Sequence, residues 1–402
     1  MFAEVWQKIL DGRSGDAAIR HPGGVWTFAQ LDRAARSREP DTCPVLGPFH
    51  LARGDAPALA SALLAGLIQG LPVQLVEADR QRRVPACPPP SGTALVKQTV
   101  GSSGLRRCQF FGLAQLQADT DRLHTALRLA ELDGVLAPLS LVHSFGLTTA
   151  LLPLLLHGLP LHWLPSPFPG SLSEALASAG RGRLLLPGAP ALWKAWLDAG
   201  IDFRSVGRAV SAGAPLRLEL EQRLRTAAGL KLHNLYGTSE TGAVSCDLDD
   251  APRTDPDDLG TLLPGVSAAP GPDGRLRVAS DAVGLGYDAP KSGEVFGDGQ
   301  HLTWDRIESV AGRLLFRACL GAGIQVAGRK LSPGEVADRL RAASGVAAIE
   351  VRGEPSRDPE RGQEVVAVID LPPDQLTREF KARACAGLAP WETPRRWVSS
   401  LA

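Results

Sequence analysis

The chain has 402 residues, which is long enough for two packed units rather than one. Hydrophobic residues make up 44% and charged residues 21%, and 43 basic residues balance 43 acidic ones. This composition is that of an ordinary globular protein with no net charge, so we expect neither a nucleic-acid partner nor a membrane partner.

The cysteines and the apolar runs indicate the compartment. Six cysteines are scattered without a CxxC pair or metal-ligand spacing, which is typical of reduced thiols. The N-terminus carries early acids and no apolar signal core. His157, Gly158 and Pro160 interrupt the most apolar run, 145–164, where we expect a buried helix followed by a strand instead of a membrane span. These features predict a cytoplasmic protein.

Apolar bursts alternate with helical patterns along most of the chain. Strands are expected at 71–76, 182–187 and 207–213, and helices at 189–199 and 216–227. The Pro-rich stretch 85–92 reads as a stiff linker, and the Asp- and Pro-rich stretch 249–258 reads as an exposed loop. The alternation predicts an α/β architecture of largely buried sheets.

The pattern changes in the last third of the chain. Short strands are expected at 274–280 and 312–318, followed by a helix at 332–342, strands at 347–352 and 364–370, and a helix at 375–386. We therefore predict a large N-terminal domain of layered sheets and helices at 1–318 and a small α+β lid domain at 319–402.

A glycine-rich loop, QTVGSSGLRR at 98–107, has the composition of an anion-binding loop. Its hydroxyl and backbone N–H donors come from Thr99, Gly101, Ser102, Ser103 and Gly104. Arg106 and Arg107 can offset phosphate charge. The GK[ST] ending of a Walker loop is absent, and a flexible surface loop would have much the same composition.

This loop resembles the TSGSTGxPK phosphate-binding motif of the acyl-adenylate-forming superfamily, with Arg106 at the place of Pro and Arg107 at the place of Lys. The superfamily includes acyl-CoA synthetases, aryl-acid ligases and peptide-synthetase adenylation domains. The resemblance implies that the loop binds the phosphates of ATP and that Arg107 has a catalytic role there.

Two further segments resemble motifs of the same family, in the same order along the chain. PLSLVHSFGL at 138–147 is similar to P-L-x-H-x-x-G-L, which implies that His143 and Phe145 lie at the acyl pocket and that His143 contributes to catalysis. VSAGAPL at 210–216 is similar to the GGAPL turn, which implies that Gly213, Ala214 and Pro215 lie against adenine.

NLYGTSETG at 234–242 matches the YGxTE signature, with Ser239 at the place of Thr. The resemblance implies that Tyr236 and Gly237 flank adenine and the acid, that Thr238 contacts the α-phosphate, and that Glu240 helps to hold Mg²⁺. A carboxylate suits that last role, because nucleotide-bound Mg²⁺ usually takes one or two protein carboxylates.

Three later segments continue the resemblance. The glycine–tyrosine segment at 274–290 ends near Gly286 and Tyr287, HLTWDR at 301–306 assigns Asp305 to the ribose hydroxyls, and IQVAGRKLSPGEV at 324–336 is similar to the IKxxGxxIxPxEI segment of the small domain.

Each motif also has an ordinary interpretation when it is taken alone. His143 could be a packed histidine, Glu240 a helix N-terminal charge and Asp305 a turn acid, while Lys97 and Lys291 could simply be solvated. The order of the motifs over nearly the whole chain is what favours the family.

The chain also departs from the family pattern. Ala318-Cys319-Leu320-Gly321 stands where the family has G-R-x-D, and Gln325 replaces the lysine that follows. The sequence ends at 390–402, before the family's GK loop, so we expect its bridging lysine to be absent, at a cost of about 10²–10³-fold in rate. We hypothesise that the loss of this lysine is compensated at the α-phosphate by Arg106, Arg107, Ser102 or Ser103.

The resemblance implies an enzyme that uses ATP and Mg²⁺ to activate a carboxylic acid as an acyl-adenylate and then transfers the acyl group to the phosphopantetheine thiol of an acyl carrier protein. His143, Phe145 and Trp163 favour a flat aromatic acid. The chain resembles ligases that load hydroxybenzoate, such as 3-hydroxybenzoate, in aryl-polyene pigment pathways. Two alternatives stay open, namely an acid–CoA ligase of the same family and a catalytically impaired nucleotide-binding or scaffold protein.

Overall fold

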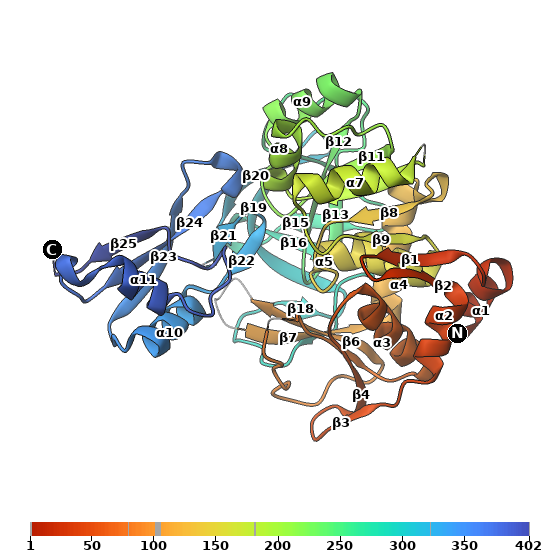
Figure 1. Cartoon of the computed structure of the whole chain (residues 1–402), viewed down its shortest axis with the longest axis horizontal. Coiled ribbons are helices and arrows are strands. Elements are labelled where there is room, and N and C mark those ends of the chain that lie inside the picture. Colours follow the sequence, from red (N-terminus) through yellow and green to blue (C-terminus); the bar gives the residue numbers. More distant parts are fainter. Residues whose placement is uncertain (1, 79, 101–105, 181, 322, 402) are drawn as a thin grey trace.

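The computed structural model describes residues 2–78, 80–100, 106–180, 182–321 and 323–401. The first three quarters of the chain form a large body of sheets and helices, and the end of the chain, blue in Figure 1, forms a smaller lobe beside it. The mixed α/β architecture predicted from the sequence is confirmed. Within the described ranges, no helix combines the length and apolar character needed to cross a membrane.

The larger sheet has 14 strands and joins a parallel block to an antiparallel one. In sheet order its strands are β15 (Ser267–Pro270), β16 (Arg275–Ala279), β19 (Gln300–Val310), β20 (Arg313–Cys319), β14 (Asp258–Leu262), β13 (Gly242–Cys246), β12 (Leu232–Thr238), β11 (Val206–Ser211), β10 (Leu184–Gly188), β8 (Gly134–Ala137), β9 (Leu161–Trp163), β1 (Ala17–His21) and β2 (Gly24–Thr27), with β18 (Phe296–Gly297) paired to β19.

Strand β12 is where the pairing changes direction. Residues 232–234 pair in parallel with β11, and residues 235–238 pair antiparallel with β13. The second half of β12 therefore leaves the parallel block at its carboxyl edge, which is the edge where open α/β sheets bind their ligands.

The second sheet has six strands, in the order β17 (Gly286–Tyr287), β7 (Arg106–Gly112), β6 (Thr93–Val100), β5 (Val73–Leu75), β4 (Gly47–Ala52) and β3 (Asp41–Cys43). Strands β6 and β7 form an antiparallel hairpin whose register runs from Thr93 opposite Gly112 to Val100 opposite Arg106. Thr99 and Arg107, which flank the predicted phosphate loop, face each other in this hairpin, whereas Gly101, Ser102, Ser103 and Gly104 lie outside the described residues.

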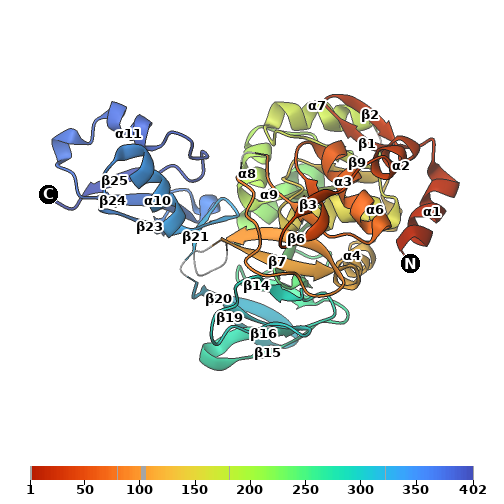
Figure 2. The same ribbon diagram turned by 90° about the horizontal axis from the view of Figure 1, so that it is seen from below.

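Helices cover the sheets of the large body (Figures 1 and 2). They are α1 (Phe2–Arg13), α2 (Phe28–Arg36), α3 (Ala56–Gln69), α4 (Leu113–Ala126), α5 (Ser144–Gly146), α6 (Leu152–His157), α7 (Pro169–Ala179), α8 (Pro190–Asp198) and α9 (Leu218–Ala228). Helix α3 is rich in Ala and Leu and buried on almost every side, and the Asp55 side chain accepts a hydrogen bond from the Ala58 N–H to begin it. The apolar run at 145–164 forms helical turns and then β9, as predicted.

The small lobe has a hydrophobic core of its own. It contains the hairpin β21 (Ile324–Val326) and β22 (Arg329–Leu331), then α10 (Pro333–Ser344), β23 (Ile349–Pro355), β24 (Gln363–Ile369), α11 (Arg378–Ala384) and β25 (Arg396–Ser399). The buried residues of this core all come from the stretch between Ile324 and Ala384. The division of the chain at residue 319 stays a prediction.

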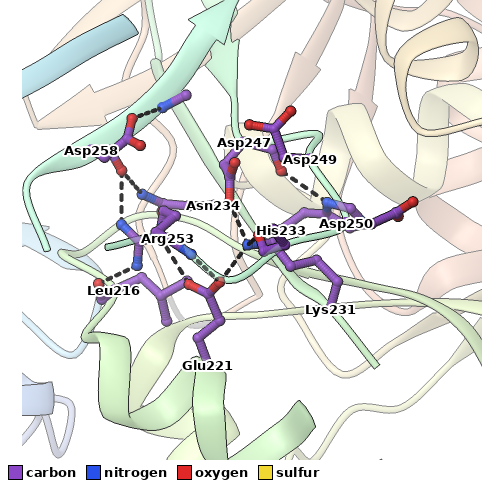
Figure 3. Close-up of polar contacts among 12 residues, drawn as sticks. Leu216, Glu221, Lys231, His233, Asn234, Asp247, Asp249, Asp250, Arg253 and Asp258 are labelled. Carbon is purple, nitrogen blue, oxygen red and sulfur yellow. Dashed lines mark hydrogen bonds and ion pairs between the residues drawn. The ribbon is translucent and has the colours of Figure 1, made fainter. Parts of the chain in front are cut away.

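The prediction of an exposed loop at 249–258 was wrong for Arg253, which is buried. Arg253 is only 6% exposed, and its guanidinium donates to Glu221 at 3.0 Å and to the Leu216 carbonyl at 2.6 Å (Figure 3). Lys231 pairs with Asp247 at 2.6 Å in the same buried network. The loop turns inward because Glu221, 1% exposed, needs cationic partners. The network ties the loop to α9 and to the start of β12.

The His162 side chain of β9 should make the stability of the fold depend on pH. Burial, together with the charge of Arg20, lowers the pKa of His162 to about 4. The unfolded chain therefore binds a proton below about pH 6.5 that the folded chain accepts only near pH 4, so stability is lost as the pH falls through this window. We expect about 2 kcal/mol less stability from this group at pH 5 than at pH 8. Urea unfolding of the wild type and of His162→Gln at both pH values measures this difference in stability. If the stability of the variant depended on pH as strongly as that of the wild type, the prediction would be contradicted.

Candidate functional site

Three parallel strands bring distant motifs to one edge of the larger sheet. The 138–147 segment follows the end of β8, the 213–215 turn follows the end of β11, and residues 236–240 lie at the end of β12. Strands β8, β10, β11 and β12 are neighbours in this order and run parallel to one another. Strand β9 is parallel to β8 on its other side. Their carboxyl ends therefore share an edge, and the three motifs meet there.

Glu240 is fixed by side chains from the second sheet. Its Oε1 atom accepts hydrogen bonds from Gln109 Nε2 of β7 at 2.8 Å and from the Tyr287 hydroxyl of β17 at 2.6 Å. His301 Nε2 lies 3.9 Å from the other carboxylate oxygen. Burial and the charge of Glu240 raise the pKa of Tyr287, so this hydroxyl stays a donor at neutral pH. Tyr287 and His301 also line a cavity of about 390 Å³.

The turn after β12 is built from backbone constraints. The Thr238 hydroxyl accepts hydrogen bonds from the N–H groups of Glu240 and Thr241, each at 3.3 Å, so it caps the turn that carries Glu240. A Cβ atom at Gly237 would lie 2.2 Å from the Gly242 carbonyl oxygen, so this position requires glycine. The role of Thr238 at the α-phosphate and that of Gly237 beside the ligand stay predictions.

Tyr236 and Asp305 are brought together from β12 and β19. The Tyr236 hydroxyl donates to Asp305 Oδ2 at 2.9 Å, across 69 residues of sequence. Burial and the nearby Asp305 charge raise the pKa of Tyr236 well above its usual value, so the hydroxyl remains protonated. The predicted adenine-flanking ring and the predicted ribose acid are therefore neighbours.

The predicted adenine turn touches the small lobe. Gly213 has φ +85°, a conformation that favours glycine, and a Cβ atom there would lie 3.2 Å from the Gly328 carbonyl oxygen. Gln325 donates a side-chain hydrogen bond to the Gly213 carbonyl. The loop of the small lobe therefore rests on the turn formed by Gly213, Ala214 and Pro215, whose contact with adenine stays a prediction.

The side chains of His143 and Phe145 lie in different surroundings. His143 Nε2 lies 3.1 Å from a Glu77 carboxylate oxygen, and Phe145 packs against the main hydrophobic core. Burial would raise the pKa of Glu77, but hydrogen bonds from His143 and Ser140 and the charges of His143 and Arg329 lower it to about 2. The residue between them, Ser144, contacts the β12 turn, since its Oγ donates to Ser239 Oγ at 3.2 Å. The assignment of His143 and Phe145 to the acid stays a prediction.

Arg107 is already paired. Its guanidinium donates both to Glu294, with one of the two bonds at 2.9 Å, and to the Ala289 carbonyl, and it stacks 3.6 Å from the centre of the Tyr287 ring. Thr99 lies opposite Arg107 in the hairpin register. The predicted catalytic role of Arg107 on the phosphate requires the pair with Glu294 to open.

The interpretation of Lys97 as a solvated residue was wrong. Lys97 is 5% exposed, and its ammonium donates to Ser144 Oγ at 2.5 Å and to the Ser239 carbonyl at 3.3 Å. Burial lowers the pKa of Lys97 to about 8, although the charges of Glu240 and Asp119 oppose this shift. The sequence held a signal that was missed, because Lys97 directly follows Leu95 and Val96, which are both buried.

The donor set suits a metal ion that arrives with a nucleotide. Within the described ranges, no group of three or more His, Cys, Asp and Glu side chains is arranged to hold a metal ion. Glu240 offers hard carboxylate oxygens, and Mg²⁺ bound to a nucleotide takes most of its ligands from phosphate oxygens and water. Glu240 therefore fits the role of the single protein ligand.

The sequence model of the AMP-binding enzyme family matches residues 54–287, which is more than half of the chain. The chain belongs to the AMP-binding enzyme family. No curated protein matches the sequence.

Solved structures share the fold of this AMP-binding enzyme. They include a malonyl-CoA ligase with methylmalonyl-CoA and AMP bound, at 20% identity and a TM-score of 0.78 over 97% of this chain and 96% of the other. The amide bond synthetase McbA of Marinactinospora thermotolerans has 20% identity and a TM-score of 0.77 over 99% and 96%. The o-succinylbenzoate CoA synthetase MenE of Bacillus subtilis, bound to a product analogue, has 16% identity and a TM-score of 0.78 over 98% and 94%.

Replacing Gly242 should damage the turn that carries Glu240. A Cβ atom at Gly242 would lie 2.5 Å from the Asp119 carboxylate, which accepts a hydrogen bond from the Ala243 N–H at 2.8 Å. Gly229 has a similar positive φ, +68° against +65°, but a Cβ atom there meets nothing within 4 Å.

We therefore expect Gly242→Ala to cost about 1–3 kcal/mol more in unfolding free energy than Gly229→Ala, because only the former forces a buried carboxylate to move. Urea unfolding of the two variants measures the difference. Equal losses in both would show that the contact with Asp119 does not constrain the turn.

Proposed function

We propose that this enzyme activates an organic acid with ATP and passes the acyl group to a thiol. In the first step the acid's carboxylate attacks the α-phosphorus of ATP, which forms an acyl-adenylate and releases pyrophosphate. In the second step a thiol attacks the acyl carbon, which forms a thioester and releases AMP. The observation that carries the proposal is the meeting of Glu240, Tyr236 and the 213–215 turn at one sheet edge, in a member of the AMP-binding enzyme family.

The protein's contribution to this chemistry is positioning and charge. Asp305 accepts the ribose hydroxyls, Tyr236 and the 213–215 turn hold the adenine, and Glu240 ligates the cation. Mg²⁺, when bound, would neutralise charge on the phosphate groups. Phosphoryl and adenylyl transfer need little covalent help from side chains, so a preorganised arrangement of this kind is enough.

The acid and the acceptor are proposed more narrowly. An aromatic, hydroxybenzoate-like acid is supported by the motif resemblance and by two aromatic residues near this edge of the sheet. Phe145 lies within the 138–147 segment, and Trp163 pairs with Ala137, the residue that precedes this segment. The phosphopantetheine thiol of an acyl carrier protein is the proposed acceptor, and the cytoplasm is the proposed location. The alternative acceptor is coenzyme A, which is favoured by the CoA ligases among the similar structures.

A scaffold or impaired nucleotide-binding protein is the alternative from another class. Cys319 and Gly321, at the positions of the family's hinge arginine and acid, favour it. The hydrogen-bonded arrangement of Glu240, at the carboxyl edge of the parallel strands, and of Asp305 against Tyr236 opposes it, because a merely structural protein has no need to hold these acids beside a ligand-binding edge.

Exchange of labelled pyrophosphate into ATP tests the first step directly. We expect the wild-type enzyme to catalyse exchange with at least one member of a panel of aromatic and aliphatic acids. Glu240→Gln should lower the exchange rate by about 10²-fold or more, because it removes a charge that acts on the phosphates. Glu174→Gln, on the exposed face of α7, is the matched control and should leave the rate unchanged.

No exchange by the folded wild type with any acid would favour the scaffold protein instead. Where exchange occurs, single-turnover transfer to coenzyme A and to a phosphopantetheinylated carrier protein then decides the acceptor, and faster transfer to coenzyme A would overturn the proposed carrier protein.

A further inference from the structure

Lys97 places a buried positive charge directly behind the proposed reaction site. It lies in β6 of the second sheet, and its Nζ donates to Ser144 Oγ and to the Ser239 carbonyl. It also lies 4.8 Å from the centre of the Phe111 ring. An ammonium has three N–H donors, and within the described ranges only these two acceptors are hydrogen-bonded to Lys97. The third N–H therefore has no protein oxygen or nitrogen as acceptor in the part of the chain that the structure describes.

The nearest acids do not pair with Lys97. The charges of Glu240 and Asp119 act on it, but neither carboxylate lies within ion-pair distance of Nζ among the described residues. Glu240 accepts from Gln109 and Tyr287, and Asp119 accepts from Thr148 and the Ala243 N–H. A buried ammonium without a direct counterion is costly, and buried charged groups of this kind cluster at functional sites.

Two hydroxyls connect this charge to the site. Ser144 belongs to the 138–147 segment and is the first residue of α5. Ser239 lies in the turn after β12, between Thr238 and Glu240. Both are partly exposed, whereas Lys97 behind them is buried, and their Oγ atoms are 3.2 Å apart. The cluster of Lys97, Ser144 and Ser239 therefore opens toward ligand at the point where the acid-binding segment meets the nucleotide-binding turn.

We propose that Lys97, with the hydroxyls of Ser144 and Ser239, binds the carboxylate of the acid substrate and holds it beside the α-phosphate. This inference rests on the proposed function. A carboxylate can accept hydrogen bonds from the third ammonium N–H and from the Ser239 hydroxyl, while the Ser144 hydroxyl accepts from Lys97 and donates to Ser239 Oγ. The carboxylate also supplies the counterion that the cluster lacks.

The position of the cluster suits the chemistry of the first step. Ser239 is next in sequence to Glu240, the proposed ligand of the cation, so a carboxylate on this cluster would be held close to the residues that are proposed to bind the phosphates. An oriented carboxylate held near its electrophile gains much of the rate that enzymes obtain from proximity. Lys97 takes no proton in this step and forms no covalent bond, because its part is to bind and orient.

The alternative is that Lys97 only fills the interior and supports the β12 turn through the Ser239 carbonyl. The two roles differ in what they affect. A carboxylate-binding lysine changes the affinity for the acid and leaves nucleotide binding intact, whereas a lysine that supports the turn changes Glu240 and therefore weakens binding of Mg-ATP.

The test compares Lys97→Met, Lys97→Arg and Ser144→Ala with a control, Lys194→Met, which removes an exposed lysine of α8. Pyrophosphate exchange gives the KM for the best acid of the panel, and calorimetry without the acid gives the Kd for Mg-ATP. We expect Lys97→Met to raise the acid KM by about 10- to 100-fold, as the loss of a charge-assisted hydrogen bond does, while the Kd for Mg-ATP changes by less than about threefold.

The other variants sharpen the result. Lys97→Arg should recover part of the lost acid affinity, and Ser144→Ala should raise the acid KM by about 3- to 10-fold, as the loss of one neutral hydrogen bond does. Ser144→Ala also decides the matter if Lys97→Met fails to fold. An unchanged acid KM in the folded variants, or a rise in the Kd for Mg-ATP that matches the rise in acid KM, would overturn the inference. Absence of exchange in the wild type would instead overturn the proposed function.

Discussion

The geometry of the site depends on the carboxylate of Glu240, where the two sheets contact each other. It follows the end of a strand in the larger sheet, yet it accepts hydrogen bonds from Gln109 and Tyr287 of the second sheet. Both of these donors are neutral side chains that orient the carboxylate. One acid therefore couples the packing of two sheets to the electrostatics of the ligand site, and a shift between the sheets would move it.

The backbone geometry of β12 and of the turn after it allows Glu240 to reach the second sheet. Strand β12 exchanges a parallel partner for an antiparallel one within seven residues, and the return to β13 requires glycine at both ends of the turn. The buried network around Arg253 and Glu221 anchors the start of β12 from behind (Figure 3). Because a buried ion pair left with one partner is costly, this network holds the strand in one register while the far end carries the chemistry.

Periodic signals in the sequence were enough to predict the elements but not their polar partners. The strands at 184–188 and 206–211 and the helices at 190–198 and 333–344 lie within a few residues of the expected ranges, because local alternation determines them. Lys97 and Arg253 were misjudged, because the burial of a charged side chain depends on partners far along the chain, such as Ser239 and Glu221. The order of motifs led to the family, whereas the donors that hold Glu240 became visible only with the two sheets in place.

We propose that Glu240, Asp305 and the 213–215 turn surround one magnesium–nucleotide complex. A crystal structure with Mg²⁺ and a non-hydrolysable ATP analogue tests this arrangement. We expect the ion at about 2.0–2.1 Å from a Glu240 oxygen, as Mg²⁺ coordination requires, with the ribose hydroxyls on Asp305 and the adenine against Gly213. A nucleotide bound elsewhere, or an ion held without Glu240, would contradict it.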